Sequence, residues 1–160
     1  MAWSDSRVFG AFLTDSLAKT TLIDINADTM NVSLIGTNST PDRNAVSAST
    51  AYNTGAFSAD KLTDTGTGGP AGWPTVGRPL VTPVCSFATG TVTFDAVDTA
   101  SASATTTITA AFGCLIYSDT IATPVVDQGI CFNYFGGTQT VTLGTLTIVW
   151  HTSGIFTITF

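Results

Sequence analysis

The chain is short of charge. Only 10% of its 160 residues are charged, against about a quarter in an ordinary soluble domain. Glutamate is absent, so all 11 acidic residues are aspartate, and no lysine or arginine follows Arg78. Beyond Arg78 the charged residues are four aspartates, so most solvent-facing positions there must be filled by uncharged residues, many of them among the 31 threonines of the chain. Such a surface loses little hydration when another protein covers it. The composition predicts a subunit of an assembly.

The scarcity of basic residues also excludes classes of partner. Five scattered lysines and arginines and a net charge of −6 cannot form the cationic patch that phosphate binding requires, so nucleic acid is not an expected partner. The mean hydropathy is high, at +0.35. No uninterrupted apolar run reaches the roughly 18 residues of a membrane helix, so no membrane span is expected.

Residues suited to catalysis are few. The single histidine, His151, follows Trp150 in a predicted strand, and we interpret it as an ordinary sheet or interface residue. Three pairs of aspartates lie close in the sequence: Asp24 and Asp28, Asp95 and Asp98, and Asp60 and Asp64. The first two pairs are candidates for glycosidase chemistry and the third for a calcium site, but aspartates at such spacings are typical of turns. We therefore expect no catalytic residue, no metal and no cofactor.

Three cysteines are present: Cys85, Cys114 and Cys131. Their number is odd and their spacing does not match a zinc site. We interpret them as small buried hydrophobic residues, which is the usual environment of free cysteine. A disulfide between Cys114 and Cys131, facing each other across a hairpin, remains the alternative.

Hydrophobic periodicity predicts one short N-terminal helix, over residues 5–18, followed by strands. The strands are expected over 29–35, 80–87, 91–96, 105–117, 129–135, 138–143, 145–151 and 155–160. Gly136-Gly137, Gly144 and Ser153-Gly154 are expected to form tight turns between the last four. Many short strands separated by turns favour a mainly β fold, namely an antiparallel, jelly-roll-like β-sandwich that forms a single domain over residues 1–160.

Residues 36–77 are rich in glycine, proline and small polar residues, and they predict a long irregular loop. Loops of such length inside a domain are often functional. This one contains Trp73 between Gly72 and Pro74, and three basic residues lie in it or at its end: Arg43, Lys61 and Arg78. Because aromatic anchors dominate interface energies, we expect Trp73 to insert into a partner and the three basic residues to supply polar contacts.

Five stretches follow the predicted N-terminal helix: Asp24–Leu34, the turn Thr40-Pro41-Asp42, Gly77–Leu80, Gly113–Thr120 and Gly144–Ile155. Together with that helix, they resemble a family of small structural proteins encoded among the head and tail genes of tailed phages. The similarity covers nearly the whole chain, and the last two stretches match best. His151 stands where the family pattern has asparagine. The resemblance implies a fold rather than a reaction, so no catalytic residue follows from it.

The resemblance implies a location in the virion. Our first expectation is a capsid decoration (cement) protein on the outside of the head, with the major capsid protein and further copies of itself, as a trimer, for partners. The alternative is a minor tail or tail-fibre protein that binds a receptor or a carbohydrate. An enzyme such as a polysaccharide depolymerase ranks third, because the sequence contains so few candidate catalytic groups.

Overall fold

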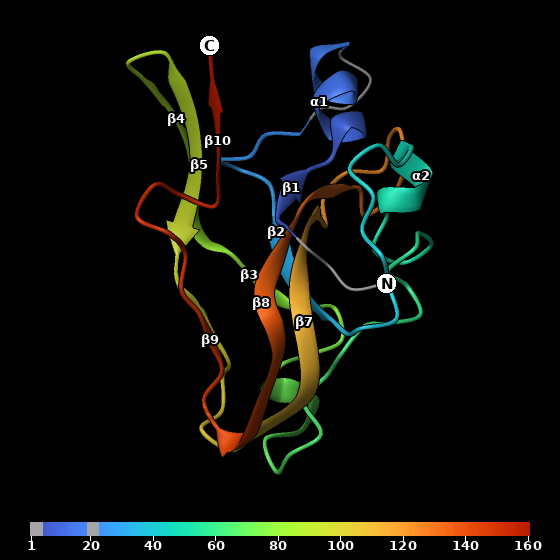
Figure 1. Cartoon of the computed structure of the whole chain (residues 1–160), viewed down its shortest axis with the longest axis vertical. Coiled ribbons are helices and arrows are strands. Elements are labelled where there is room, and N and C mark those ends of the chain that lie inside the picture. The colour runs from blue at the N-terminus through green and yellow to red at the C-terminus, as the bar shows by residue number, and fades with distance from the viewer. Residues whose placement is uncertain (1–4, 19–22) are drawn as a thin grey trace.

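The computed structural model describes residues 5–18 and 23–160. The fold is mainly β, with antiparallel sheets arranged as a sandwich, which confirms the predicted fold class. Figure 1 shows two layers of strands that run along the long axis of the molecule. The first layer is one sheet in the order β1 (Arg7–Val8), β8 (Gly129–Gly144), β7 (Thr106–Ser118), β2 (Met30–Ile35) and β3 (Arg78–Pro79).

The second layer consists of two smaller sheets. One has the order β10 (Phe156–Thr159), β5 (Thr91–Val97) and β4 (Val81–Ala88), and the other pairs β6 (Thr99–Ala100) with β9 (Thr147–Ile148). Since β6 follows β5 after one residue, the two sheets lie end to end along the chain (Figure 1). The expected strand pair around residues 88–90 is confirmed as the β4–β5 hairpin, and the expected strand over 105–117 is confirmed as β7.

The predicted N-terminal helix is present but begins later than expected. Arg7 and Val8 form β1, which pairs with Phe132 and Cys131 of β8. The helix α1 (Gly10–Leu17) therefore starts only after Phe9, whose backbone is extended. The prediction that the helix begins at residue 5 is wrong, because strand pairing takes the first residues of that pattern. Two shorter helical pieces were not predicted, namely α2 (Ser47–Thr50) and the 3₁₀ turn η1 (Gly69–Ala71).

The prediction of two strands joined by a turn at Gly136-Gly137 is wrong, because β8 runs through both glycines as one strand. Gly113 pairs with Tyr134 and Ala111 pairs with Gln139, so β8 advances five residues while β7 advances two. The extra residues form a bulge, and the positive φ angles of Gly136 (78°) and Gly137 (147°) explain why glycines stand there.

Residues 145–151 and 155–160, which the sequence predicts as two strands joined by a tight turn, do not pair with each other. Only Thr147–Ile148 form a strand in the first of these segments, and β9 pairs with β6. The second segment contributes β10, which pairs with β5. The turn at Ser153-Gly154 is present, since the N–H of Gly154 donates to the carbonyl of His151 at 2.7 Å. It directs the chain from one small sheet of the second layer to the other.

The sequence predicts that residues 36–77 form a long loop that reaches a partner, and this is wrong because the segment packs against its own domain. Helix α2 and the chain around it lie beside the first sheet (Figure 1), and the side chains of Tyr52, Phe57 and Trp73 are fully buried. The ring of Phe57 contacts that of Phe9 with centroids 6.0 Å apart. We call residues 36–77 the covering segment. Because of it every residue of β2 is buried, including Asn31 and Ser33, whose side chains alternate with the apolar ones.

The three cysteines are free. Cys114 and Cys131 are buried in β7 and β8, as expected for small hydrophobic residues, whereas Cys85 in β4 is partly exposed. Cys131 pairs across the hairpin with Ile116, and Cys114 pairs with Asn133. Cys131 is therefore two residues away from the partner of Cys114, and both thiols are free, so the alternative of a disulfide between them is not what this fold contains.

Candidate interaction surface

Trp73 lies in the core, with an exposed fraction of 0%. The expectation that it projects toward a partner is therefore wrong. Its backbone carbonyl accepts hydrogen bonds from the N–H of Asp64 and the hydroxyl of Thr63, both at 2.9 Å. These bonds close residues 64–73 into a compact loop that turns the indole inward. The flanking Gly72 and Pro74 predict an irregular backbone correctly, but nothing in them tells which way the side chain points.

Lys61 is engaged within the chain. Its Nζ lies 4.2 Å from the centroid of the Tyr52 ring and donates to Oδ1 of Asn53 at 3.1 Å. A cation placed over an aromatic ring is attracted by the negative face of the ring. Burial raises the pKa of Tyr52 to about 12, so the ring remains uncharged beneath the ammonium group. Lys61 therefore stabilises the covering segment and is a weaker candidate for contact with a partner than the sequence suggests.

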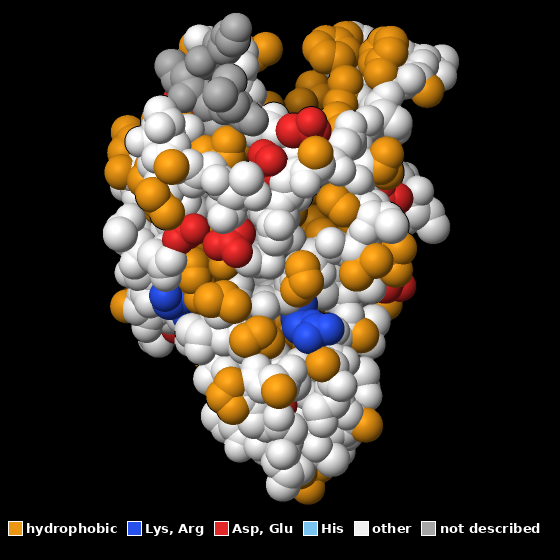
Figure 2. Space-filling model, turned by 180° about the vertical axis from the view of Figure 1, so that it is seen from behind, with side chains coloured by type: hydrophobic (Ala, Val, Ile, Leu, Met, Phe, Trp, Pro, Cys, Tyr) orange, Lys and Arg blue, Asp and Glu red, His pale blue; other side chains and the backbone are white. Residues whose placement is uncertain are grey.

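Arg43 and Arg78 differ in exposure. Arg43 is exposed, and its backbone carbonyl accepts the N–H of Gly10 at the start of α1. Arg78 is half-buried in β3, where it pairs with Val32. In the part of the chain that the structure describes, the one ion pair joins Arg7 to Asp5, at 2.7 Å. The structure thus brings none of the four predicted contact residues together, and the basic side chains visible in Figure 2 lie apart.

Two buried aspartates hold the covering segment in place. The carboxylate of Asp60 accepts the backbone N–H groups of Asn38 (2.8 Å) and Ser39 (2.7 Å) and the side-chain amide of Asn38 (3.1 Å). The carboxylate of Asp64 accepts the N–H groups of Gly66 and Thr107, each at 2.7 Å. Both carboxylates thus act as acceptors for backbone donors, and this role replaces the calcium site that the sequence left open.

The pKa of Asp64 reflects these contacts. Burial alone would raise the pKa of this carboxyl, but the N–H groups of Thr107 and Gly66 stabilise its ionised form and hold the pKa below its usual value. Among residues 5–18 and 23–160, no three His, Cys, Asp or Glu side chains gather into a possible metal site. The structure therefore gives both buried carboxylates a structural explanation.

The remaining acidic pairs and the histidine accept hydrogen bonds from backbone N–H groups. Asp28 Oδ2 accepts the N–H of Asp24, and the N–H of Asp28 donates to the carbonyl of Asp24, both at 2.8 Å. Asp95 accepts the N–H of the next residue, whereas Asp98 accepts that of Trp150 at 2.9 Å. His151 is exposed, and its Nδ1 accepts the N–H of Ser153 at 3.1 Å. The turn interpretation is therefore confirmed for Asp24 and Asp28, whereas it is wrong for Asp95, which lies in β5, and for Asp98, which joins β5 to β6.

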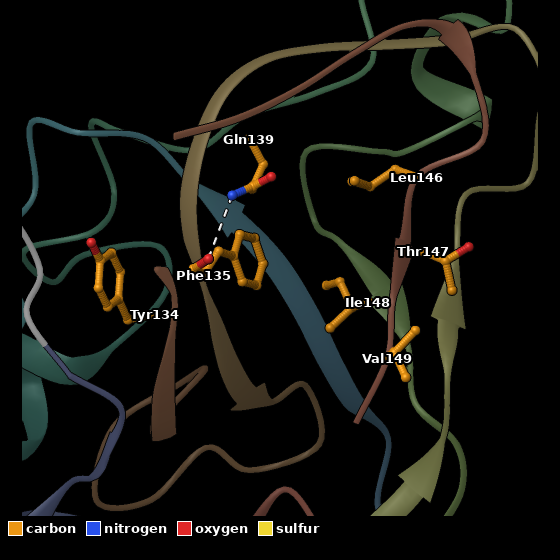
Figure 3. Close-up of a pocket in the computed structure, with 7 residues that line it drawn as sticks. All are labelled: Tyr134, Phe135, Gln139, Leu146, Thr147, Ile148 and Val149. Carbon is orange, nitrogen blue, oxygen red and sulfur yellow. Dashed lines mark hydrogen bonds between the residues drawn. The ribbon is translucent and has the colours of Figure 1, made fainter. Parts of the chain in front are cut away.

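A groove of about 370 Å³ lies between β8 and β9. Figure 3 shows Phe135 of the β8 bulge facing Ile148 of β9, with Gln139 at one end. The Gln139 side chain donates to the carbonyls of Phe135 and Gly137, both at 3.4 Å. Leu146, Thr147, Val149 and Tyr134 complete the lining. The groove contains apolar and amide groups but no carboxylate or basic side chain, so it fits a neutral ligand better than a charged one.

Exposed hydrophobic side chains are the most prominent surface feature. Eleven large ones are exposed in the described part of the chain, and five of them belong to the β10–β5–β4 sheet or the residue that follows it: Val81, Val84, Phe87, Val97 and Phe160. The projecting end of this sheet, at the upper right of Figure 2, carries a group of hydrophobic side chains. A concentration of this kind is typical of an interaction surface.

No helix in the described residues is long and apolar enough to cross a membrane. Comparison of the chain with models of protein families, with curated proteins and with solved structures found no match.

Proposed function

We propose that the chain is a virion structural protein, and specifically a capsid decoration protein that binds the outside of a phage head and stabilises the shell. Its partners are the major capsid protein and further copies of itself, with a trimer as the expected assembly. The observation that supports this proposal most is the low charge of the chain, in which 10% of the residues are charged, together with the large hydrophobic side chains exposed on its β scaffold. The resemblance to phage structural proteins adds to it.

Such a protein stabilises the shell through its binding equilibrium. A protein that binds the mature shell but not its precursor stabilises the mature shell by mass action, and many copies add their contributions. No enzymatic step is needed, and the aspartates and the histidine considered above have structural partners instead. Arg43 is the exposed basic residue of the covering segment and supplies a contact to capsid carboxylates. Trp73 contributes by keeping this segment folded.

The test is to mix the purified full chain with mature phage shells that lack it. We expect occupancy across the whole lattice and a higher disassembly temperature of the shell. Arg43→Ser should weaken binding most at low salt, because an exposed ion pair is screened by added ions. Arg7→Ser is the matched control, since Arg7 already pairs with Asp5. A handful of copies per particle, or none, would exclude the decoration function.

The groove in Figure 3 favours a second candidate, a minor tail or tail-fibre protein that binds a receptor or a carbohydrate. Aromatic rings beside amide and hydroxyl groups, such as Phe135 and Tyr134 with Gln139 and Thr147, suit a neutral sugar. A glycan array together with antibody labelling of virions distinguishes the two candidates. Saturable sugar binding and label at the tail would support the tail protein, whereas label over the head supports the decoration protein.

A further inference from the structure

An amine, a carboxamide and a carboxylate meet where the covering segment approaches the start of β8. The Nζ atom of Lys61 donates to Oδ1 of Asn53 at 3.1 Å. The nitrogen of the same amide, Nδ2, donates to the carboxylate oxygen Oδ2 of Asp127. The amide of Asn53 therefore lies between the other two groups and contacts both of them.

Each of the three groups is held by a different part of the fold. Lys61 forms an isolated β-bridge with Ile35 at the end of β2, and its Nζ lies 4.2 Å from the centroid of the Tyr52 ring. Asn53 directly follows Tyr52, which is buried. Asp127 is also buried, and its carbonyl accepts the N–H of Tyr52 at 3.0 Å. The fold thus brings the groups together in advance, which is the condition for a fast reaction within one molecule.

Asp127 has an unusual backbone conformation. Its φ angle is 58°, in the left-handed region that residues other than glycine seldom adopt. In this conformation its carbonyl faces the N–H of Tyr52 while its carboxylate accepts the amide of Asn53. Such conformations cost free energy and are concentrated at functional sites. The backbone at Asp127 is therefore consistent with a chemical role for its carboxylate.

We propose that Lys61 and Asn53 become joined by an intramolecular amide (isopeptide) bond, and that Asp127 transfers the proton. The amine of Lys61, after losing one proton to water, attacks the carbonyl carbon Cγ of Asn53 and forms a bond between Nζ and Cγ. A second proton passes from Nζ through the carboxyl group of Asp127 to Nδ2. The bond between Cγ and Nδ2 then breaks, and Nδ2 leaves as ammonia, which is protonated in water.

The geometry suits each of these steps. Nζ contacts the oxygen that is bonded to Cγ, so rotation about the terminal bonds of the half-buried Lys61 side chain brings it onto the face of the amide. Asp127 contacts the leaving nitrogen, which is where the proton must arrive. In the tetrahedral intermediate both nitrogens are bonded to one carbon, so a single carboxyl group reaches both. Asn53 is exposed, so ammonia escapes into solvent.

The reaction exchanges one amide for another, so it needs no oxidant, metal or cofactor. It closes residues 53–61 into a covalent ring within the covering segment and makes the contact between Lys61 and Asn53 permanent. A cross-link of this kind restricts the unfolded chain. The inference goes beyond the proposed function, because the bond forms in the isolated chain whether or not the chain binds a phage shell.

Intact mass spectrometry of the purified full chain measures the reaction. After prolonged incubation, we expect the folded wild type to be lighter than its sequence by the mass of one ammonia molecule. Trypsin cleaves after lysine only where the amine is free, so the bond between Lys61 and Leu62 should resist cleavage. Fragmentation of the resulting peptide should locate a branch between Asn53 and Lys61.

Three variants test the roles of the residues. Lys61→Arg retains a positive charge and hydrogen-bond donors but lacks the attacking amine, so it should keep its full mass. Asp127→Asn should react at least about 100-fold more slowly, because it lacks the proton-transferring carboxyl group. Lys19→Arg is the matched control, since Lys19 is the other lysine of the sequence, and it should lose ammonia as the wild type does. Thermal unfolding of each variant confirms that it is folded.

The possible results separate clearly. Ammonia loss with a branch at Lys61, in the wild type and Lys19→Arg alone, supports the proposal. Full mass in the folded wild type after prolonged incubation overturns it. Ammonia loss that persists in Lys61→Arg also overturns it, because an asparagine can lose ammonia by closing onto its own backbone. Bond formation at the wild-type rate in Asp127→Asn overturns the role assigned to Asp127.

Discussion

The rings of Tyr52 and Tyr117 stack face to face, with centroids 4.3 Å apart and an angle of 4° between their planes. Tyr52 belongs to the covering segment and Tyr117 to β7, so the stack joins the segment to the first sheet. Both hydroxyls donate to backbone carbonyls further along the segment, Tyr52 to Thr75 and Tyr117 to Val76. Lys61 lies over the ring of Tyr52. The covering segment is therefore held through aromatic side chains as well as through its two aspartates.

This arrangement predicts the effect of Tyr117→Phe. The variant retains the ring but removes the hydroxyl, which donates to Val76 at 2.7 Å and accepts from the Asn31 amide at 3.3 Å. Both partners then lack their hydrogen bond in a buried site, so we expect the free energy of unfolding to fall by about 1–2 kcal/mol. Urea denaturation measures it. Tyr134→Phe, at a half-exposed ring, is the control and should change the value by less than about 0.5 kcal/mol.

Asp64 predicts a pH dependence of stability. Its folded-state pKa is lower than normal, so its ionised form stabilises the fold above the unfolded-state pKa of about 4. This contribution is lost as the pH falls below about 4 toward the folded-state pKa. Asp64→Asn should lower the free energy of unfolding by roughly 2 kcal/mol or more at pH 7, because it weakens two charge-assisted hydrogen bonds.

Denaturation of the wild type and Asp64→Asn at pH 7, 4 and 3 tests this expectation. The difference between the two proteins should be largest at pH 7 and should shrink steadily as the carboxyl of the wild type is protonated. Asp42→Asn is the control, because Asp42 is exposed and caps a local turn through the N–H of Asn44. A difference that stays constant down to pH 3 would mean that the Asp64 carboxylate does not stabilise the fold through its charge.

Because Trp73 is buried, truncating its side chain should lower the stability of the fold and not only the affinity for a partner. Trp73→Ala should lower the free energy of unfolding by about 3–5 kcal/mol, as expected for truncating a large core side chain, and Trp73→Phe should cost less. Val76→Ala, at a side chain that is 52% exposed in the same segment, is the control. Thermal and urea denaturation measure the effect. Unchanged stability with lost shell binding would restore the surface-anchor role that the sequence suggested.

The sequence predicted the strands well where apolar residues alternate or run continuously, as in β2, β4, β5 and β7. The prediction from sequence failed where the same local pattern is compatible with two different structures. A Gly-Gly pair permits positive φ both in a tight turn and in a bulge, and only the partner strand decides between them. Residues 145–151 and 155–160 both alternate, yet each pairs with a strand that lies some fifty residues or more earlier in the chain. Local sequence contains no information about such distant partners.

The candidate surface was harder to predict for a related reason. Composition indicated correctly that residues 36–77 lack regular structure over most of their length, but irregular backbone can be buried when its polar groups are satisfied. Asp60 and Asp64 satisfy them here, and a single sequence does not distinguish an aspartate that binds backbone N–H groups from one in water. The exposure of Phe87 and Phe160 was also missed, because both residues follow the same alternation as the less exposed residues that precede them.

Cysteine reactivity tests the packing of the hairpin between β7 and β8. Burial raises the pKa of Cys131 to about 12, and burial together with the neighbouring Cys131 raises the pKa of Cys114. At pH 8 these two thiols therefore remain protonated, whereas the thiolate is the reactive form. In dilute folded protein a thiol reagent should therefore label the partly exposed Cys85 first.

All three cysteines should react after unfolding without reductant. If only Cys85 reacted in the unfolded chain, Cys114 and Cys131 would be joined. Fast reaction of all three in the folded chain would mean that the hairpin opens readily, because neither buried thiol is accessible in the closed sheet.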